Sequence, residues 1–314
     1  MRDAACRAWV ALAQRDPFVF LTGDLGFRAL EPLRDALGAR FVNAGVAEQN
    51  MVSVAAGLAS QGHAAWVYSI APFCYARPYE QIRNDVCLHG LPVKLVGNGG
   101  GYGYGAMGAT HHALEDYGAL LALPGMEAWV PAFDADVAPA IEAMARASGP
   151  AWLRLGRDEA PAGYAPPPLA PFRRLLDGER GVVVCIGPLA GGVLALLAPL
   201  GPLERPALWV LSRLPVTAEG GDGELPRDLV GAIERTGGLL VGEEHTATGS
   251  AGERLARILL ERGVRVRRFA HACARGYPSG RYGSQQWHRR ECGLDAASIV
   301  ARARECAGGE VGAS

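Results

Sequence analysis

Short apolar runs alternate with longer helical patterns through the first half of this sequence. The apolar runs fall at 18–25, 41–45, 64–70, 91–98, 126–132 and 151–156, and the helical patterns at 3–15, 47–61, 76–89 and 134–147. Runs that are apolar throughout indicate strands buried on both faces, and strands that alternate with helices pair in parallel. The pattern therefore predicts an α/β fold with a parallel sheet that helices cover on both sides.

A proline-rich segment, "DEAPAGYAPPPLAP" at 158–171, interrupts this alternation with five prolines. Because such segments form semi-rigid spacers, it predicts a domain boundary. Beyond it the alternation resumes, with predicted strands at 181–188, 206–212, 237–245 and 264–271. We therefore expect two α/β domains with parallel sheets, one over 1–160 and one over 172–314.

The composition excludes several classes of protein. The 314 residues have a formal net charge of −1, with 49% hydrophobic and 20% charged residues. These values are typical of soluble globular proteins and give no basic surface for nucleic acid or anionic membranes. The seven cysteines contain no C-x-x-C pair, which favours a reducing compartment and predicts a cytoplasmic location. Residues 1–16 predict an amphipathic helix rather than a signal peptide, and glycines and prolines break the apolar stretch 181–203 too often for a membrane span.

The helical pattern in "VNAGVAEQNMVSVAAGLA", residues 42–59, leaves no broad polar face, which predicts a helix buried on nearly all sides. Glu48 lies in the first turn of this helix. A carboxylate buried there needs a partner. It could accept hydrogen bonds from nearby backbone N–H groups as a cap. Asn43 is the better N-cap candidate, however, and that leaves Glu48 available for another partner.

The loop "GNGGGYGYGAMG", residues 97–108, contains the pattern Gly103-x-Gly105-x-x-Gly108. This pattern matches the dinucleotide-binding fingerprint only in spacing. The fingerprint follows the first strand of its unit and needs an acid at the end of the next strand, whereas this loop follows the fourth predicted strand and Glu127 precedes the core of the next one. A loop whose backbone approaches some ligand closely is the better interpretation.

Two further clusters contain histidines and acidic residues that could bind a metal or take part in catalysis. "THHALED", residues 110–116, spaces His111 and Glu115, and His112 and Asp116, by four. Such pairs could ligate a metal on a helix, but no third ligand at a suitable spacing accompanies them; the alternative is a helix start with an exposed His–Asp pair. "EEH", residues 243–245, ends a predicted strand, where a cap or an interface salt bridge is favoured over catalysis.

Several stretches, in order, resemble the C-terminal half of transketolases: "VNAGVAEQNMVSVAAGLA", "YSIAPFCYARPYEQIRNDV", "GYGAMGATHHALEDYGALLALPGMEAWVPA" and "LVGEEHTATGSAGERLARIL". The resemblance covers nearly the whole chain and extends to 1-deoxyxylulose-5-phosphate synthases and to the beta subunits of 2-oxoacid dehydrogenases. Its most specific pieces are "GVAEQ" and "GATHH". It implies a pyrimidine-binding domain, then a transketolase C-terminal domain, and thiamine diphosphate as cofactor.

The resemblance also assigns roles to individual residues. Glu48 matches the glutamate that hydrogen-bonds ring nitrogen N1′ of the aminopyrimidine and so promotes loss of the thiazolium C2 proton. Phe73 matches an aromatic residue that packs on the pyrimidine, whereas Ile70 stands where a second phenylalanine is usual. Asp24 in "GDLG" matches an acid near the cofactor, and His111 matches the histidine that contacts substrate oxygens near the reacting carbon.

One family motif is missing from the chain. Transketolases hold the diphosphate and Mg²⁺ with a Gly-Asp-Gly motif followed by Asn, and "TGDLG" is not that motif. The resemblance therefore implies half of an enzyme, with no metal ligands here and with Mg²⁺ held by a partner, an N-terminal-half transketolase subunit. We expect an α2β2 heterotetramer in which the "QIRNDV" helix at 81–86 and the second domain hold the two copies of this chain together.

Two departures affect the substrate side of the resemblance. Met107 stands where transketolases have an aspartate that binds a sugar hydroxyl, and Gly99 stands where they have a histidine that binds the acceptor phosphate. Arg157 still matches an arginine of that phosphate site. Because a thioether makes no strong hydrogen bond, these residues predict transfer of a two-carbon ketol unit from a ketose to an aldehyde that is more apolar than a sugar phosphate, in specialised metabolism.

Other functions compete with this hypothesis. The beta subunit of a 2-oxoacid dehydrogenase or decarboxylase would share the fold but not the reaction; "GATHH" favours a transketolase, since the oxoacid enzymes usually carry a different His-Ser stretch there. A non-catalytic scaffolding homologue is disfavoured because Glu48 is retained. An oxidoreductase of the dinucleotide-binding type is a distant alternative.

Overall fold

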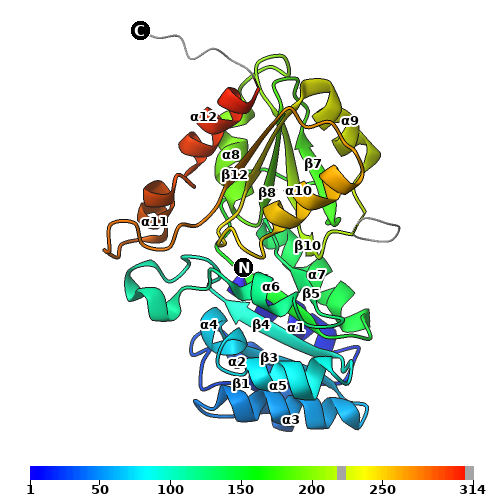
Figure 1. Cartoon of the computed structure of the whole chain (residues 1–314). Helices are drawn as coiled ribbons and strands as arrows, with labels where there is room; N and C mark the ends of the chain where they lie inside the picture. The colour runs from blue at the N-terminus through cyan, green and yellow to red at the C-terminus, as the bar shows by residue number, and fades with distance from the viewer. Residues whose placement is uncertain (218–223, 308–314) are drawn as a thin grey trace. The chain divides into compact units, whose positions relative to one another are not determined.

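The computed structural model describes residues 1–217 and 224–307, and the chain divides into two compact units, Met1–Arg157 and Asp158–Ser314 (Figure 1). This division falls where the proline-rich segment begins. The domain bounds at 160 and 172 stay a prediction. We refer to the two parts as the first unit and the second unit.

The first unit is built on a parallel sheet. Its strands run in the order β5-β6-β4-β3-β1-β2, and each neighbouring pair is parallel. The strands are β1 (Phe18–Thr22), β2 (Phe41–Asn43), β3 (Ala64–Ile70), β4 (Val93–Asn98), β5 (Glu127–Trp129) and β6 (Ala151–Leu155). The central strands β3, β4 and β6 are almost entirely buried, which agrees with their uninterrupted apolar sequence.

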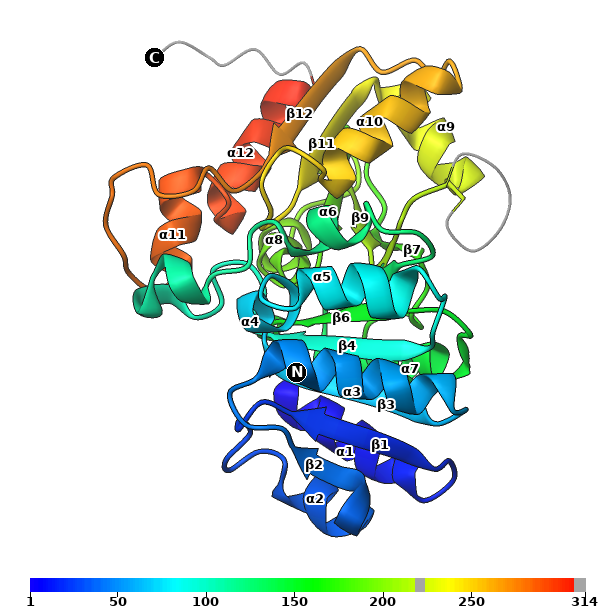
Figure 2. The same ribbon diagram turned by 60° about the horizontal axis from the view of Figure 1, so that its bottom comes forward.

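Helices cover both faces of this sheet, with α1 and α7 on one side and α3 and α5 on the other (Figure 2). Trp9 of α1 is fully buried and meets Phe20 and Trp66 edge-on, with ring centroids 5.0 and 5.8 Å apart, which fixes α1 against the strands. The helices are α1 (Arg2–Ala13), α2 (Glu31–Leu37), α3 (Glu48–Ser60), α4 (Ala71–Tyr75), α5 (Tyr79–Gln81), α6 (Asp116–Leu120) and α7 (Asp134–Arg146), with short helices η1 (Gly38–Arg40), η3 (Gly105–Met107) and η4 (Ala109–His111) and the π-helix η2 (Ile82–Cys87).

Lys94, the only lysine in the sequence, is buried in β4. Its Nζ donates hydrogen bonds to the carbonyl oxygens of Ala147 and Gly149, at 2.7 and 2.6 Å, and so satisfies carbonyls that follow the end of α7. Burial lowers the pKa of this ammonium group to about 8. The hydrogen bonds of Lys94 thus connect the segment after the C-terminal end of α7 to β4, in the middle of the sheet.

The second unit holds a mixed sheet in the order β12-β11-β8-β9-β7. Neighbouring strands from β12 to β9 in this order are parallel, but β7 is antiparallel to β9, so the prediction of an all-parallel second sheet is wrong at this edge. The sequence "FRRLL" of β7 carries two arginines and gives no apolar run to identify it. The elements of the unit are β7 (Phe172–Leu176), β8 (Val182–Ile186), α8 (Leu189–Leu197), β9 (Ala207–Leu211), β10 (Arg213–Leu214), α9 (Arg227–Thr236), β11 (Gly238–Gly242), α10 (Ala251–Glu261), β12 (Arg268–Ala272), α11 (Gln285–Cys292) and α12 (Ala296–Cys306).

The structure corrects two expectations about α3. The side chains of Val46 and Val54 are 74% and 42% exposed, and Asn50 and Gly57 are exposed as well, so this chain alone does not bury the helix on nearly all sides. Asn43 does not cap the helix either. The N-cap is Ala47, with no side-chain hydrogen bond, because the Asn43 side chain is held in the preceding loop.

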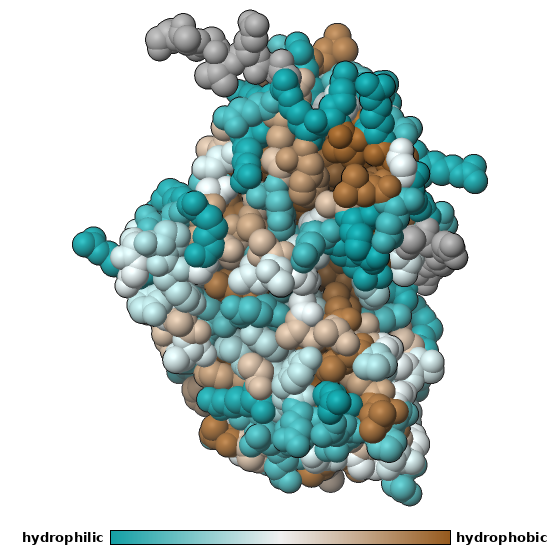
Figure 3. All heavy atoms as spheres, in the orientation of Figure 1, coloured by the Kyte–Doolittle hydropathy of each residue, from teal (hydrophilic) through white to brown (hydrophobic). Residues whose placement is uncertain are grey.

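The surface mixes hydrophilic and hydrophobic side chains over both units on the face drawn in Figure 3. Within residues 1–217 and 224–307, no helix combines the length and the apolar character that a membrane span requires. The mixture agrees with the moderate content of charged residues.

Candidate active site

Glu48 begins α3 and is buried, with 3% exposure. Each of its carboxylate oxygens has a partner. Oε1 accepts a hydrogen bond from Ser69 Oγ at 3.2 Å, and Oε2 accepts one from Arg77 Nη1 at 3.0 Å. A Cβ added to Gly23 would lie 3.4 Å from Oε1, so the backbone after β1 runs directly beside the acid. The first residue of α3 thus places one buried carboxylate beside the ends of β1 and β3.

Arg77 is a residue of this candidate site that the sequence patterns did not single out. Its guanidinium carbon lies 3.9 Å from the centre of the Phe73 ring, so one cation contacts both Glu48 and the face of Phe73. The Arg77 side chain is 45% exposed, in contrast to the buried acid that it pairs with. Its position could have been suspected from the need of a buried Glu48 for a cation, with "YAR" following the aromatic stretch.

His111 lies between two aromatic rings. Its ring centroid is 5.1 Å from that of Phe73 and 6.0 Å from that of Tyr104, and its Nδ1 lies 2.9 Å from Thr110 Oγ1. Glu48, Arg77, Phe73 and His111 therefore form one continuous row of contacts in the first unit. Three of these four residues are those that the family resemblance predicts.

The histidine pair does not occupy one helix. Ala109–His111 is the short helix η4, and α6 begins only at Asp116, so the two i, i+4 pairs that could have ligated a metal do not lie on one helix. His112 is buried, with Nε2 2.8 Å from the carbonyl oxygen of Gly105. Asp116 is also buried and accepts a hydrogen bond from Trp152 Nε1 at 3.1 Å, so the alternative of an exposed His–Asp pair is wrong as well.

The remaining predicted cofactor residues lie on segments next to this row. Asp24 adopts a left-handed backbone with φ of 58°, held by Asn43, whose Nδ2 donates to Asp24 Oδ1 at 2.8 Å. Ile70 is half-buried at the start of α4, between Ser69 and Phe73 in the chain. The structure therefore brings the loop of Asp24 and the position of Ile70 to the surroundings of Glu48.

Met107 and Arg157 lie at the edges of the first unit. Met107 is 57% exposed and ends η3, which leads through Gly108 into the helix of His111. Arg157 is exposed, and among the described residues it has no hydrogen-bond or ion-pair partner. The structure therefore shows no contact between Arg157 and the row of Glu48 to His111.

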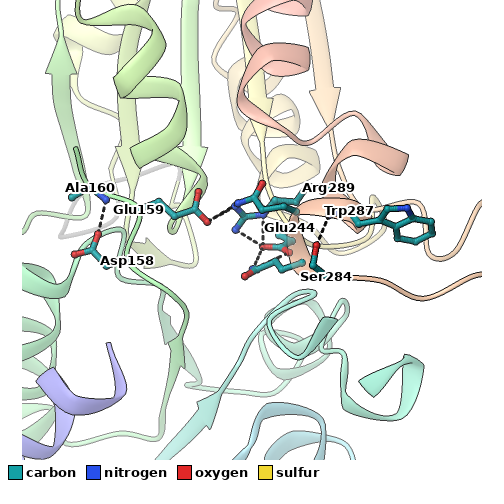
Figure 4. A network of polar contacts seen from close by, with 9 residues as sticks. Asp158, Glu159, Ala160, Glu244, Ser284, Trp287 and Arg289 are labelled. Carbon is teal, nitrogen blue, oxygen red and sulfur yellow. Dashed lines mark hydrogen bonds and ion pairs between the residues drawn. The ribbon is translucent and has the colours of Figure 1, made fainter. Parts of the chain in front are cut away.

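The "EEH" segment has a structural role in the second unit. Glu243 accepts hydrogen bonds from the backbone N–H groups of Ala251 and Gly252 at the start of α10, at 3.1 and 2.7 Å. Glu244 accepts from Nη2 of Arg289 at 3.0 Å, and Arg289 also pairs with Glu159 (Figure 4). This agrees with the interpretation of the segment as a strand-end cap and salt bridge.

Burial alone would lower the pKa of Arg289, but the carboxylates of Glu244 and Glu159 outweigh that effect and raise it. The guanidinium therefore stays charged. It ties the start of the second unit to α11 and to the end of β11.

Metal ligands do not converge in the part of the chain that the structure describes: no group of three or more His, Cys, Asp and Glu side chains there could hold an ion. The location of Mg²⁺ ligands on another subunit stays a prediction.

Comparisons with known proteins agree with this arrangement. The family model described as the pyrimidine binding domain of transketolase matches residues 1–162. One of the subunits of the apulose-4-phosphate transketolase from Phocaeicola vulgatus is 30% identical over 264 residues, which cover 82% of each chain. A 1-deoxy-D-xylulose-5-phosphate synthase from Myxococcus xanthus is 33% identical over 86% of this chain but only 45% of its own length. A solved structure described as a split gene transketolase, in an inactive beta4 tetramer, superposes with a TM-score of 0.79 and 26% identity over 98% of this chain and 97% of that one.

The fold and the site define an α/β protein in which a buried acid lies beside a half-buried aromatic row. The chain belongs to the transketolase family.

Proposed function

We propose that this chain is the pyrimidine-binding subunit of a two-component transketolase. The observation that carries this proposal is the continuous row from the buried Glu48, through Arg77 and Phe73, to the half-exposed His111. The similarity of most of the chain to a subunit of apulose-4-phosphate transketolase supports it. The reaction would break the bond between C2 and C3 of a ketose, release the shorter aldehyde, and join the two-carbon ketol unit to a second aldehyde.

The residues present fit one half of thiamine diphosphate. Glu48 offers a buried carboxyl group to a ring nitrogen, and Phe73 offers an aromatic face beside it. Ile70 and the loop of Asp24 would border the same ring. When bound, the cofactor supplies a nucleophilic carbon that can add to a carbonyl group. Glu48 would hold the ring nitrogen with its buried carboxyl group, out of contact with water.

Arg77 occupies the groups that the cofactor would contact. Its guanidinium holds Glu48 Oε2 and covers the face of Phe73, which are the two groups that the aminopyrimidine would use. We infer that Arg77 swings outward when the cofactor binds. The 45% exposure of its side chain gives it room in solvent.

His111 would act on the substrate. An imidazole nitrogen can donate a hydrogen bond to a carbonyl or hydroxyl oxygen, and Thr110 Oγ1 beside Nδ1 orients the ring. Met107, four residues before His111, would favour an acceptor with few hydroxyl groups, and Arg157 would be the remaining cation for any phosphate. These assignments support an acceptor that is more apolar than a sugar phosphate.

A partner subunit would complete the site. Val46, which precedes α3, and Val54, which lies on it, are exposed apolar residues near Glu48 in the chain, and such residues are suited to a contact with another protein. We propose that the diphosphate- and Mg²⁺-binding subunit covers this surface, in an α2β2 heterotetramer held in part by η2 and the second unit, and that the enzyme acts in the cytoplasm.

The test is reconstitution with such a partner. The pair should bind thiamine diphosphate and transfer a ketol unit from β-hydroxypyruvate to an aldehyde, while this chain alone should bind the cofactor weakly in calorimetry and turn nothing over. Tight cofactor binding by the single chain, or 2-oxoacid decarboxylation without ketol transfer by the pair, would contradict the proposal. The second result would indicate a 2-oxoacid dehydrogenase subunit instead.

A further inference from the structure

A tyrosine ring fills the space beside Gly99. Gly99 has φ of +75°, and a Cβ added there would lie 2.2 Å from Cε2 and 2.4 Å from Cδ2 of Tyr104. Position 99 therefore accepts only glycine, both for its backbone and because the ring is already in place. Asn98 Nδ2 donates a hydrogen bond to the Tyr104 hydroxyl at 2.8 Å and holds the ring from the end of β4.

The same ring contributes to the surroundings of His111. Tyr104 approaches His111 with ring centroids 6.0 Å apart, and Phe73 approaches it at 5.1 Å. Both aromatic residues are half-buried, and Met107 of the adjacent η3 is 57% exposed. A ligand that reaches His111 from solvent therefore meets two aromatic rings and a thioether.

Arg154 packs against this loop and is already engaged by other groups. Arg154 packs so closely that a Cβ on Gly100 would lie 2.1 Å from its Nε. This Nε lies 3.4 Å from Asp116 Oδ2, and Nη2 donates to the carbonyl oxygen of Ala113 at 3.1 Å. Both side chains of the Arg154–Asp116 pair are almost fully buried, at 6% and 0% exposure. Arg154 is therefore held inside the unit and does not turn toward a ligand at His111.

We propose that Tyr104 determines the acceptor of the reaction: an aldehyde that carries a flat or apolar group, which packs on the Tyr104 ring while the carbonyl oxygen meets His111. This inference rests on the proposed function. An aromatic ring there would stabilise a flat group, whereas a polyhydroxylated chain would lose hydrogen bonds to water without replacement. Burial raises the pKa of the Tyr104 phenol, so the group beside the ligand stays uncharged.

The experiment compares acceptors with the reconstituted pair and β-hydroxypyruvate as donor. The wild type should show a higher kcat/KM for benzaldehyde than for ribose 5-phosphate. In Tyr104→Ala, the ratio of kcat/KM for benzaldehyde to that for glycolaldehyde should fall about 3- to 10-fold, mainly through KM. Tyr104→Phe keeps the ring and loses only the hydroxyl, and should keep this ratio within about twofold.

A binding measurement supplements the kinetics. Saturation-transfer NMR with benzyl alcohol should show contact with the wild-type chain, loss of contact in Tyr104→Ala, and retention in Tyr104→Phe. Phe269, an aromatic residue of the second unit that is 42% exposed, provides the control, since Phe269→Ala should keep the signal. A ratio that does not change in Tyr104→Ala, or a wild-type preference for ribose 5-phosphate, overturns the inference about Tyr104. Failure of the pair to extend any aldehyde, with Tyr104-dependent binding of benzyl alcohol intact, overturns the proposed function and leaves this aromatic site standing.

Discussion

Each unit of this chain buries one glutamate against an arginine at the same distance, with opposite surroundings for the arginine. Glu48 and Arg77 meet at 3.0 Å in the first unit, and Glu244 and Arg289 meet at 3.0 Å in the second. The two carboxylates are similarly hidden, at 3% and 8% exposure. The arginine side chains differ, at 45% exposure for Arg77 and 2% for Arg289.

The difference in exposure between the two arginines indicates that a ligand can replace Arg77 at its glutamate but cannot replace Arg289. Arg289 lies buried between two carboxylates, so neither acid can readily exchange it for another group. Arg77 can leave Glu48 for solvent when a ligand takes its place at the acid, because its half-exposed guanidinium already contacts water. A buried acid paired with a half-exposed arginine is suited to bind a ligand. A buried acid paired with a buried arginine is suited to stabilise the folded state.

The substitution with the largest expected effect is Glu48→Gln. It keeps the shape of the side chain but removes the carboxyl group that would hold the cofactor proton, so turnover by the reconstituted pair should fall about 10²–10⁴-fold. Steady-state kinetics measures this. Glu80, an exposed acid on α5, provides the control: Glu80→Gln should retain activity. Activity of Glu48→Gln close to that of the wild type would remove Glu48 from the mechanism.

Arg289→Met should have the largest effect on stability. It leaves Glu244 and Glu159 without their shared cation, and loss of one partner from a buried ion pair costs about 3–5 kcal/mol of the free energy of unfolding. Urea denaturation followed by circular dichroism gives the value. The neighbouring Arg290 is exposed, and Arg290→Met should change stability little. Equal effects of the two substitutions would show that the Arg289 pair is not a permanent support.

Ser69→Ala should have an intermediate effect. Ser69 supplies the second hydrogen bond to Glu48, at 3.2 Å, and is itself fully buried. Removal of a hydrogen bond to a charged group costs about 1.5–3 kcal/mol, which should appear as a lower free energy of unfolding of the single chain. Ser60→Ala, at an exposed serine on the same helix as Glu48, should cost less. No difference between these two variants would mean that Arg77 alone satisfies the acid.

Arg77→Met should have the smallest effect. Unlike the other substitutions, which lower activity or stability, it should raise the affinity for the cofactor. The Arg77 side chain is 45% exposed, so solvent screens its attraction to Glu48 to about 0.2–1 kcal/mol. Loss of this competing cation should let thiamine diphosphate bind to the reconstituted pair up to about fivefold more tightly. Isothermal titration calorimetry measures the dissociation constant. Arg83, exposed on η2, gives the matched control. Weaker cofactor binding in Arg77→Met than in Arg83→Met would show that Arg77 supports the cofactor and does not compete with it.

Much of the fold could be predicted because buried parallel strands have an uninterrupted apolar sequence. β1, β3, β4 and β6 all lie within predicted strands for this reason. The antiparallel β7 escaped prediction because its arginines break the apolar pattern. The apolar sequence of α3 predicted a helix buried on nearly all sides, and this was wrong for the chain described here, in which Val54 is 42% exposed.

The site was less accessible from sequence than the fold. Glu48, Phe73 and His111 could be found through the family resemblance, and the structure brings them together. The only sequence signal for Arg77 is the need of a buried Glu48 for a cation, since its one contact to that acid joins residues 29 positions apart. Tyr104 lies in a glycine-rich loop whose conformation, not its composition, places the ring beside His111.

The buried Lys94 gives the first unit a built-in chemical reporter. Its amine is the only lysine amine of the sequence, and in the folded chain it is 3% exposed and bonded to two carbonyl oxygens. An acylating reagent needs an uncharged, accessible amine, and burial keeps the reagent away from Lys94 in the folded chain. Access then requires the strand and α7 to separate, so the rate of Lys94 acylation would measure how often this part of the sheet opens.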